Sequence, residues 1–145
     1  MKQNPMMLRY SEPAPIQDDF LHYSTNDCAW ERFSLPLGNG FFGANLFGRL
    51  KTERVQISEP TLANPYYAPK TIPRRRMCAS GMNNMAELLI DFNHEGATDY
   101  ERALSIDDAV HTVSYIFNGV TYTRTAFTSH PDRVLVMRFF PIPHA

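Results

Sequence analysis

The clearest pattern in the chain is a pair of runs in its second half in which apolar and polar residues alternate. Residues 111–117 and 120–127 each alternate, and Asn118-Gly119 separates them. Asn-Gly between two such runs favours a two-residue type I′ turn, because both turn positions need positive φ. The pattern therefore predicts a β-hairpin over residues 111–127.

The turn also fixes which residues of the hairpin face each other across the two strands. Neither resulting face is purely polar, so both are expected to be at least partly covered. This arrangement predicts an all-β fold, an antiparallel β-sandwich of two packed sheets. The predicted pairs are Phe117 with Val120, Tyr115 with Tyr122 and Val113 with Arg124 on one face, and Ile116 with Thr121, Ser114 with Thr123 and Thr112 with Thr125 on the other.

Short runs rich in aromatic and β-branched residues predict further strands on both sides of this hairpin. The chain holds 11 prolines and 7 glycines that interrupt these runs every few residues, which is typical of many short strands. Gly43 and Gly48 indicate bulges or close backbone contacts. The predicted strands are 41–50 and 53–57 (a hairpin joined at Lys51-Thr52), 86–92, 100–105, and a buried strand at 133–140 after a turn at 130–132; only residues 106–110 allow a single helical turn.

The length of 145 residues suits one domain with its own core, and we expect a single β-sandwich over 1–145. Residues 59–81 contain four prolines and predict a long proline-rich loop. The last predicted strand runs directly into residues 141–145 without a polar closing segment. This leaves an open apolar edge, which complete proteins avoid, and so predicts an incomplete sandwich.

Composition and charge narrow the function classes. Hydrophobic residues make up 43% and charged residues 20% of the chain, which argues against disorder, and a net charge of −1 favours neither nucleic acid nor a membrane surface as a partner. No segment has the apolar length of a signal peptide or membrane span, so a cytoplasmic location is predicted if the natural chain starts here. Arg74-Arg75-Arg76 is interpreted as a solvated turn. Cys28 and Cys78 fit either buried thiols or one disulfide.

Nucleotide-binding, metalloprotease and serine-hydrolase motifs are absent, and the five histidines are scattered singly. No cofactor or metal site is therefore predicted. Glu87 and Asp91 lie about 13 Å apart on one face of a strand, which is too wide for the carboxylate pair of a glycosidase. We interpret them as the polar side of that strand. The candidate carboxylates are Glu59, Glu87, Asp91 and Glu95. Glu59 begins the long loop and has the reach to contact a substrate, but its interpretation as a solvated loop carboxylate is favoured.

Two segments combine glycines or polar groups at a strand end. Residues 36–43 form a glycine-dense turn around Asn39, and residues 56–62 lead a strand into the long loop. Glycine lets a backbone approach another group closely. A tight hairpin explains the first segment equally well, and a structural turn explains the second.

Taken in order, these segments resemble the N-terminal domain of glycoside hydrolase family 95, the inverting α-L-fucosidases and their relatives. Each motif is common alone, but their order is specific and covers nearly the whole chain. The matching motifs are residues 8–10, 36–44 with 47–48, 53–59 with 61–62, 86–92, 99–104, 107–115, 119–124 and 129–136.

The resemblance implies a supersandwich-like N-terminal domain packed on an (α/α)₆ barrel in the same chain. In that family the barrel supplies the catalytic glutamic acid and the Asn/Asp-assisted water that hydrolyse an oligosaccharide with inversion. No barrel motif lies within 1–145, so no catalytic residue is carried over and the chain alone is predicted to be inactive. Asn39, Glu59 and Thr61 lie in matching motifs and are expected to face the barrel and border the sugar pocket. Ala63-Asn64-Pro65 replaces the family's usual Trp and small residues beside this region.

A different class of function is also compatible with the pattern. A free-standing carbohydrate-binding or protein-interaction β-sandwich would need exposed aromatic residues, and Trp30, Tyr66 and Tyr67 are the candidates. Aromatic residues near turns more often belong to a core, so the enzyme-domain interpretation is favoured.

Overall fold

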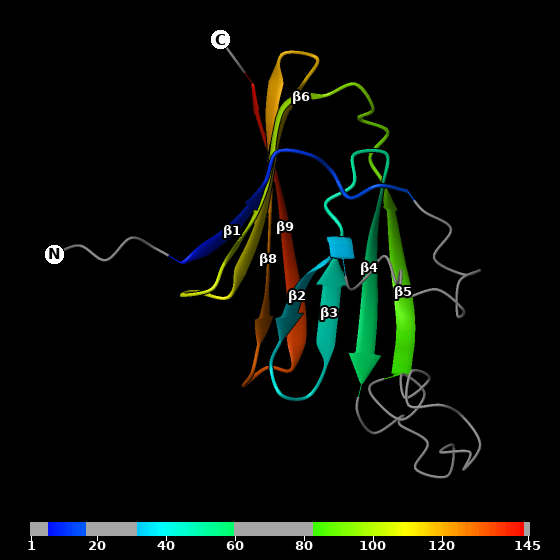
Figure 1. The fold of residues 1–145 in the computed structure, drawn as a ribbon, viewed down its shortest axis with the longest axis vertical. Coiled ribbons are helices and arrows are strands. Elements are labelled where there is room, and N and C mark those ends of the chain that lie inside the picture. Colours follow the sequence, from blue (N-terminus) through cyan, green and yellow to red (C-terminus); the bar gives the residue numbers. More distant parts are fainter. Residues whose placement is uncertain (1–5, 17–31, 60–82, 144–145) are drawn as a thin grey trace, which may run out of the picture.

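The computed structural model describes residues 6–16, 32–59 and 83–143 (Figure 1). Within these segments every extended element is a strand of one of two sheets, which confirms the predicted all-β class. The strands are β1 (Met7–Tyr10), β2 (Leu35–Gly38), β3 (Gly43–Leu46), β4 (Thr52–Glu59), β5 (Asn83–Asp91), β6 (Thr98–Ser105), β7 (Val110–Phe117), β8 (Val120–Ser129) and β9 (Val134–Pro143).

The two sheets form the layers of an antiparallel sandwich. One sheet has five strands in the order β1-β6-β7-β8-β9, and the other has four in the order β2-β3-β4-β5. Contacts of β2 with β7 and β8 join the layers. Figure 1 shows that the layers are offset, with β4 and β5 lying to one side of β9. The predicted sandwich is therefore confirmed, but its sheets overlap only in part.

The β7–β8 hairpin has the predicted register at every position. All six expected cross-strand pairs occur, from Phe117 with Val120 to Thr112 with Thr125. Asn118 has φ of 50° and Gly119 has φ of 73°, as a type I′ turn requires. Alternate residues of β7 are buried and half-buried, so both faces of this strand are at least partly covered.

Apolar side chains that point between the layers form the main core. Leu35 and Leu46 are almost fully buried between the sheets, and Val55 is fully buried. Burying aliphatic side chains of this kind stabilises a fold by about 1.5–3 kcal/mol each. The core cluster comprises Leu35, Leu37, Ala44, Leu46, Val55, Leu104 and Ala126, with Ile57, Leu135 and Met137 packed against it.

The first half of the chain contains one more hairpin than predicted. The glycine-dense turn is the connection between β2 and β3, which pair from Leu35–Leu46 to Gly38–Gly43. The predicted strand 41–50 is too long, because the chain leaves the sheet after Leu46. Phe47 turns to a second apolar cluster with Ala14 and Phe33. The predicted pairing of this segment with 53–57 is confirmed between β3 and β4.

Gly48 makes the close backbone contact that its position suggested. Its φ is 69°, and a Cβ built there would lie 2.6 Å from the hydroxyl of Tyr100. That hydroxyl donates a hydrogen bond to the Gly48 carbonyl oxygen at 2.5 Å. Only glycine fits this position, since it needs both the left-handed conformation and the space.

The last strand is longer and more exposed than predicted. It continues through two prolines to Pro143, and Val134, Phe139 and Ile142 are exposed, so its interpretation as a buried strand ending at residue 140 is wrong. Its position at the end of the sheet explains the exposure. The open apolar edge expected from the sequence is present in the part of the chain that the structure describes.

The hydrogen-bonding direction of β9 explains why the prolines are tolerated. A two-residue turn makes Phe117 and Val120 a hydrogen-bonded pair, so Val120 and every second residue after it in β8 point their backbone groups to β7. The alternate residues of β8 point to β9, where they face Val134 and the other even-numbered positions. The backbone groups of Pro141 and Pro143 therefore point away from β8, and no ladder hydrogen bond is lost.

The remaining predictions about the fold have mixed outcomes. Residues 106–109 form a turn and no helix, with Ala109 at φ of 53°. Residues 60–81 of the proline-rich loop, Cys28 and Cys78 lie outside the described residues. No helix among those that the structure describes is long and apolar enough to cross a membrane. The cytoplasmic location and the single-domain boundary stay predictions.

Two glycine substitutions separate backbone strain from steric overlap. Gly119→Ala places a Cβ in open space at a positive φ, and we expect the free energy of unfolding to fall by about 1–2 kcal/mol. Gly48→Ala adds an overlap with Tyr100, and we expect a further loss of about 1–3 kcal/mol. Urea unfolding of both variants measures the difference; equal losses would contradict the close contact at Gly48.

Candidate functional site: the turn surface and the interlayer ion pair

Asn39 organises the turn between β2 and β3. Its Oδ1 accepts hydrogen bonds from the backbone N–H groups of Phe41 at 3.0 Å and Phe42 at 3.1 Å. Its Nδ2 donates to the carbonyl oxygen of Ser129 at 2.7 Å. The side chain is 8% exposed. Asn39 thus shapes the turn and joins it to the end of β8 in the opposite layer.

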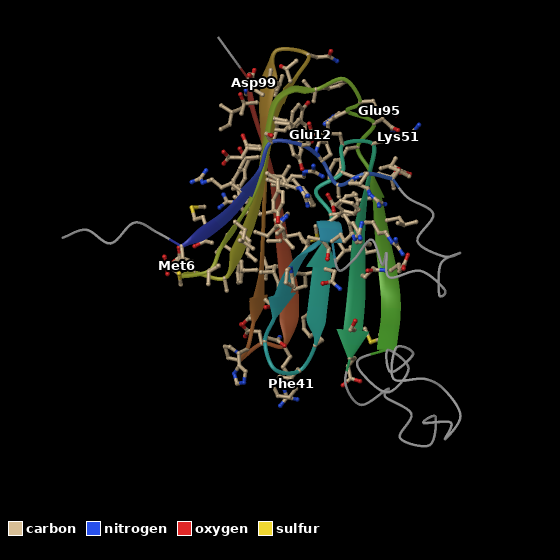
Figure 2. The ribbon with its side chains drawn as sticks, in the orientation of Figure 1. Met6, Glu12, Phe41, Lys51, Glu95 and Asp99 are labelled. Carbon is tan, nitrogen blue, oxygen red and sulfur yellow. The ribbon has the colours of Figure 1, made fainter. Side chains whose placement is uncertain are left out.

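Aromatic and cationic groups continue this connection at the surface. The rings of Phe41 and His130 lie with centroids 5.6 Å apart, and the Arg133 guanidinium lies 3.9 Å from the centre of the Phe41 ring. Phe41 is 36% exposed and lies at the lower end of the sandwich (Figure 2). We call the group of Asn39, Phe41, Ser129, His130 and Arg133 the turn surface. It is a polar and aromatic end face, formed where two hairpin turns from different sheets meet.

Glu59 lies at the same end of the four-stranded sheet as this turn. It is the last residue of β4, and the register pairs its neighbour Ser58 with Gly43, which is paired with Gly38. Two of the three residues predicted to face a barrel are therefore brought to one end of the domain. Thr61 lies outside the described residues, as do Trp30, Tyr66 and Tyr67. The prediction that Asn39, Glu59 and Thr61 border a sugar pocket stays a prediction.

The other candidate carboxylates make structural contacts. Glu87 accepts hydrogen bonds from Arg54 at 2.5 and 3.1 Å, and Asp91 accepts one from the Thr52 hydroxyl at 2.6 Å. These contacts agree with the interpretation of Glu87 and Asp91 as the polar side of a strand. Glu95 lies 3.4 Å from Lys51 in an exposed ion pair, a type that contributes little to stability.

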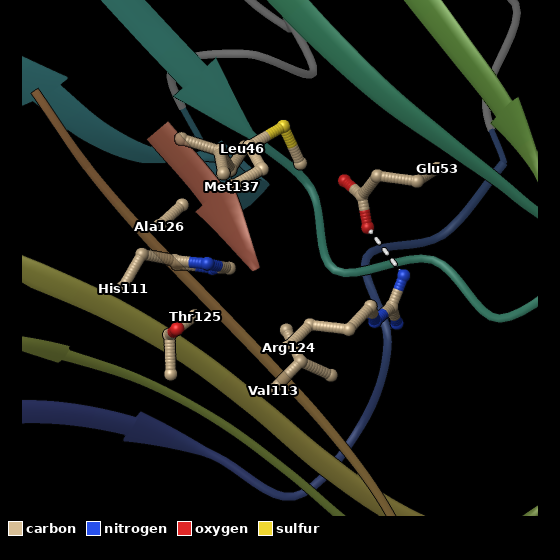
Figure 3. A pocket seen from close by; sticks show the side chains of 8 residues that line it. All are labelled: Leu46, Glu53, His111, Val113, Arg124, Thr125, Ala126 and Met137. Carbon is tan, nitrogen blue, oxygen red and sulfur yellow. Dashed lines mark hydrogen bonds and ion pairs between the residues drawn. The ribbon is translucent and has the colours of Figure 1, made fainter. Parts of the chain in front are cut away.

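Among the described residues the most buried carboxylate is Glu53, which the sequence did not single out. Its Oε2 accepts a hydrogen bond from Arg124 Nη1 at 3.0 Å (Figure 3). Its Oε1 accepts from the N–H groups of Phe47 at 3.1 Å and Gly48 at 2.9 Å. Burial raises the pKa of Glu53, while Arg124 and the two backbone amides oppose that rise. The pair joins β4 of one layer to β8 of the other.

The predicted hairpin register indicates that Arg124 needs a partner. Arg124 falls on the same face as Val113 and Tyr115, which are each 1% exposed. An arginine among buried residues needs an ionised or carbonyl partner. The alternation did not indicate which carboxylate supplies that partner, because Glu53 lies in the other sheet.

A small cavity lies beside the ion pair, between the layers (Figure 3). His111 lines it together with Arg124, Met137 and Leu46. Its volume of about 10 Å³ suits one water molecule and is far below that of a sugar site. Burial lowers the pKa of His111 to about 3, and the nearby Arg124 and Arg102 guanidinium groups act in the same direction. The imidazole is therefore neutral in the fold, and the cavity is part of the core.

Stacked aromatic rings continue from the ion pair toward the other end of the five-stranded sheet. Tyr115 lies between Tyr100 and Tyr122, with ring centroids 6.5 and 5.5 Å away. His94 Nδ1 is 3.0 Å from the Tyr115 hydroxyl, and the His94 ring stacks on Phe117 at 4.5 Å. Burial raises the pKa of Tyr115. These contacts fix the loop after β5 to the sheet and give the rings a packing role.

No group of histidine, cysteine, aspartate or glutamate side chains suited to a metal ion occurs in segments 6–16, 32–59 and 83–143. The carboxylates of Glu53, Glu87, Asp91 and Glu95 contact arginine, lysine, threonine or backbone donors.

Comparison with known proteins gives the family. The model of the glycosyl hydrolase family 65 N-terminal domain matches residues 62–140, which is more than half of the chain. The chain belongs to this family of N-terminal domains. The predicted resemblance to an N-terminal glycoside hydrolase domain is thereby confirmed, while the number 95 stays a prediction because the matching model carries the number 65.

A curated relative of this glycosyl hydrolase N-terminal domain is Alpha-L-fucosidase 2 of Arabidopsis thaliana. It is 24% identical over 138 residues, and the match covers 74% of this chain. The chain spans 16% of the length of the plant protein. Most of that relative therefore has no counterpart in the 145 residues.

We expect Glu53 and Arg124 of this family member to be strongly coupled in their contributions to the free energy of unfolding. Glu53→Gln leaves the Arg124 charge buried without its partner, and we expect the free energy of unfolding to fall by about 3–5 kcal/mol. Arg124→Met should cost a similar amount, and the double variant should cost clearly less than the sum. Urea unfolding of the three variants measures the coupling; additive losses would show that the two side chains act independently.

Because His111 is buried, we expect the protein to lose stability in acid. Its folded pKa is about 3 against an ordinary 6.5, so between these values the unfolded chain binds a proton that the fold excludes. Stability should therefore fall as pH drops through this window, by up to about 1.4 kcal/mol per pH unit. His111→Phe should flatten this dependence, because phenylalanine fills the site without a titrating group. Unfolding curves between pH 7.5 and 4 provide the measurement, and identical slopes for wild type and His111→Phe would refute the assignment.

Proposed function

We propose that this chain is the non-catalytic N-terminal domain of an inverting α-L-fucosidase-type glycoside hydrolase, and that it helps to shape the sugar pocket of an (α/α)₆ barrel in the same polypeptide. Membership in a family of glycosyl hydrolase N-terminal domains carries the proposal. The name of the relative, Alpha-L-fucosidase 2, supports the substrate class, and the small share of its length that this chain spans supports a longer parent polypeptide.

The turn surface is the face that we assign to the barrel. It unites turns from both sheets through the Asn39 side chain, so its shape is set by the sandwich as a whole. Phe41, His130 and Arg133 give it an aromatic and cationic character that suits contact with another protein surface or a sugar ring. Glu59 ends β4 at the same side and adds a carboxylate to this face.

The role of such a face is to position groups that the barrel supplies. Misplacement of a substrate-binding wall by about 1 Å can reduce the rate of a reaction by about 100-fold, even when the wall contains no reacting group. A rigid turn held by three hydrogen bonds and a guanidinium stack is well suited to fix such a wall. The catalytic acid and the activated water belong, in this proposal, to the barrel.

The test uses the full-length polypeptide that carries this domain and an aryl α-L-fucoside as substrate. Phe41→Ser in the turn surface should lower kcat/KM by about 10-fold, with a fall in kcat, because the displaced pocket wall misplaces the sugar relative to the groups of the barrel. Ile106→Ser is the matched control, since Ile106 is also exposed but lies in the turn between β6 and β7. It should leave kcat/KM within about twofold of wild type.

Two outcomes would overturn parts of the proposal. A full-length polypeptide without activity on α-L-fucosides would remove the fucosidase assignment. Equal kinetics for the Phe41 and Ile106 variants, at unchanged thermal stability, would remove the turn surface from the pocket while leaving the enzyme assignment in place.

A further inference from the structure

The two sheets of the sandwich end at different places on the side of β9. Leu135 and Met137 of β9 pack against the main core opposite β3 and β4. The four-stranded sheet continues past this point with β5, whose strand lies to the side of β9 in Figure 1. The five-stranded sheet thus ends before the four-stranded sheet on this side of the sandwich.

Burial of the β5 side chains confirms this offset. The register pairs Leu88 with Val55, so both side chains lie on the face directed at the other sheet. Val55 is fully buried, whereas Leu88 is 41% exposed. Ala86, two residues earlier on the same face, is also exposed. In the described part of the chain, this apolar inner face of β5 is therefore left partly exposed on the side of β9.

The free edge of β9 offers backbone groups to the same space. Its odd-numbered residues point their N–H and C=O groups away from β8, as the register of the β7–β8–β9 ladder requires. Among the described strands only β8 pairs with β9, so the N–H groups of Leu135, Met137 and Phe139 on the other edge meet no described strand, whereas Pro141 and Pro143 have no N–H to offer. The pairing-competent part of the edge is therefore Leu135 to Phe139.

From these observations we infer that the space between the free edge of β9 and the inner face of β5, which we call the notch, is a docking site for one added β-strand. The strand pairs with Leu135–Phe139 and places apolar side chains against Ala86 and Leu88, in the way that extended segments join exposed sheet edges. The opposite face of the added strand lies beside Arg138, so an acidic residue on that face would be complementary to the Arg138 charge. Resting on the proposed function, we assign this strand to the remainder of the parent hydrolase polypeptide, of which a domain of this kind forms a small share in the plant relative.

A second copy of the chain fits the notch less well. Antiparallel pairing of two β9 strands relates the copies by a two-fold axis normal to the sheet, so both four-stranded sheets lie on the same side. The β5 strand of each copy would then occupy the space over the β9 strand of the other. Because β5 already extends past β9, the two β5 strands would collide. A lone strand meets no such obstacle.

Residue-resolved hydrogen exchange of the full-length polypeptide tests the inference. We expect the amides of Leu135, Met137 and Phe139 to exchange at least about 100-fold more slowly than free peptide. Val136 and Arg138, which bond to β8, serve as internal references and should be protected in any case. Free-peptide exchange at the three odd-numbered amides would overturn the inference. Protection that disappears on dilution would also overturn it, since a second copy would then be the occupant.

Two substitutions on β5 give a matched comparison. Leu88 faces the notch and Leu89 faces the opposite side of the sheet, and both are exposed in the described structure. Leu88→Ser in the full-length polypeptide should accelerate exchange at Met137 by about 10-fold or more, and Leu89→Ser should not. Equal effects of the two variants would count against a strand beneath Leu88.

The outcome is independent of the enzymatic assignment. Protected β9 amides in a polypeptide without glycosidase activity would refute the proposed function and leave the docked strand in place. Activity with unprotected amides would refute the docked strand alone.

Discussion

The hydrogen bonds of the Glu53 carboxylate hold together the parts of this fold that have no backbone ladder between them. One oxygen accepts hydrogen bonds from the amides of Phe47 and Gly48, where the chain leaves β3. The other accepts a hydrogen bond from Arg124 of the opposite sheet. A buried carboxylate is costly unless each of its oxygens is satisfied. The requirement fixes the turn after β3, the separation of the layers and the orientation of β8 at one point.

The surrounding residues follow from this constraint. Gly48 must be glycine because its amide is turned toward Glu53 while the Tyr100 hydroxyl binds its carbonyl. Tyr100 in turn begins the stack of rings that leads through Tyr115 to Tyr122. Arg102 donates hydrogen bonds to the carbonyl oxygens of Glu12, Phe33 and Phe47, so the N-terminal segment is attached near the same place. Polar contacts at the centre and apolar contacts around them therefore depend on one another.

Local features of the fold were predictable from the sequence, and features that join distant segments were not. The register of β7 and β8 follows from Asn118-Gly119 alone, because a two-residue turn leaves one pairing that satisfies the alternation. Glu53 and Arg124 lie 71 residues apart, and the residue pattern of neither strand indicates that these two side chains pair. Pro141 and Pro143 lie within β9, because the effect of a proline on a strand depends on which edge its missing N–H faces. That edge is defined only when the neighbouring strands are known. The structure places Asn39 and Glu59 at one end of the domain, and the sequence held no signal for the contact of Asn39 with Ser129.

The position of β1 has a consequence for the order of events on the ribosome. β1 precedes the other strands of its sheet in the sequence, yet it pairs with β6, and the Met6 amide donates a hydrogen bond to Asp107 across 101 residues of sequence. It must therefore wait until β6 has been synthesised before it finds its neighbour. Contacts of such long range slow folding, because a large loop must close before they stabilise anything. During translation Leu8 and Tyr10 remain available to chaperones for longer than any other apolar part of this sheet.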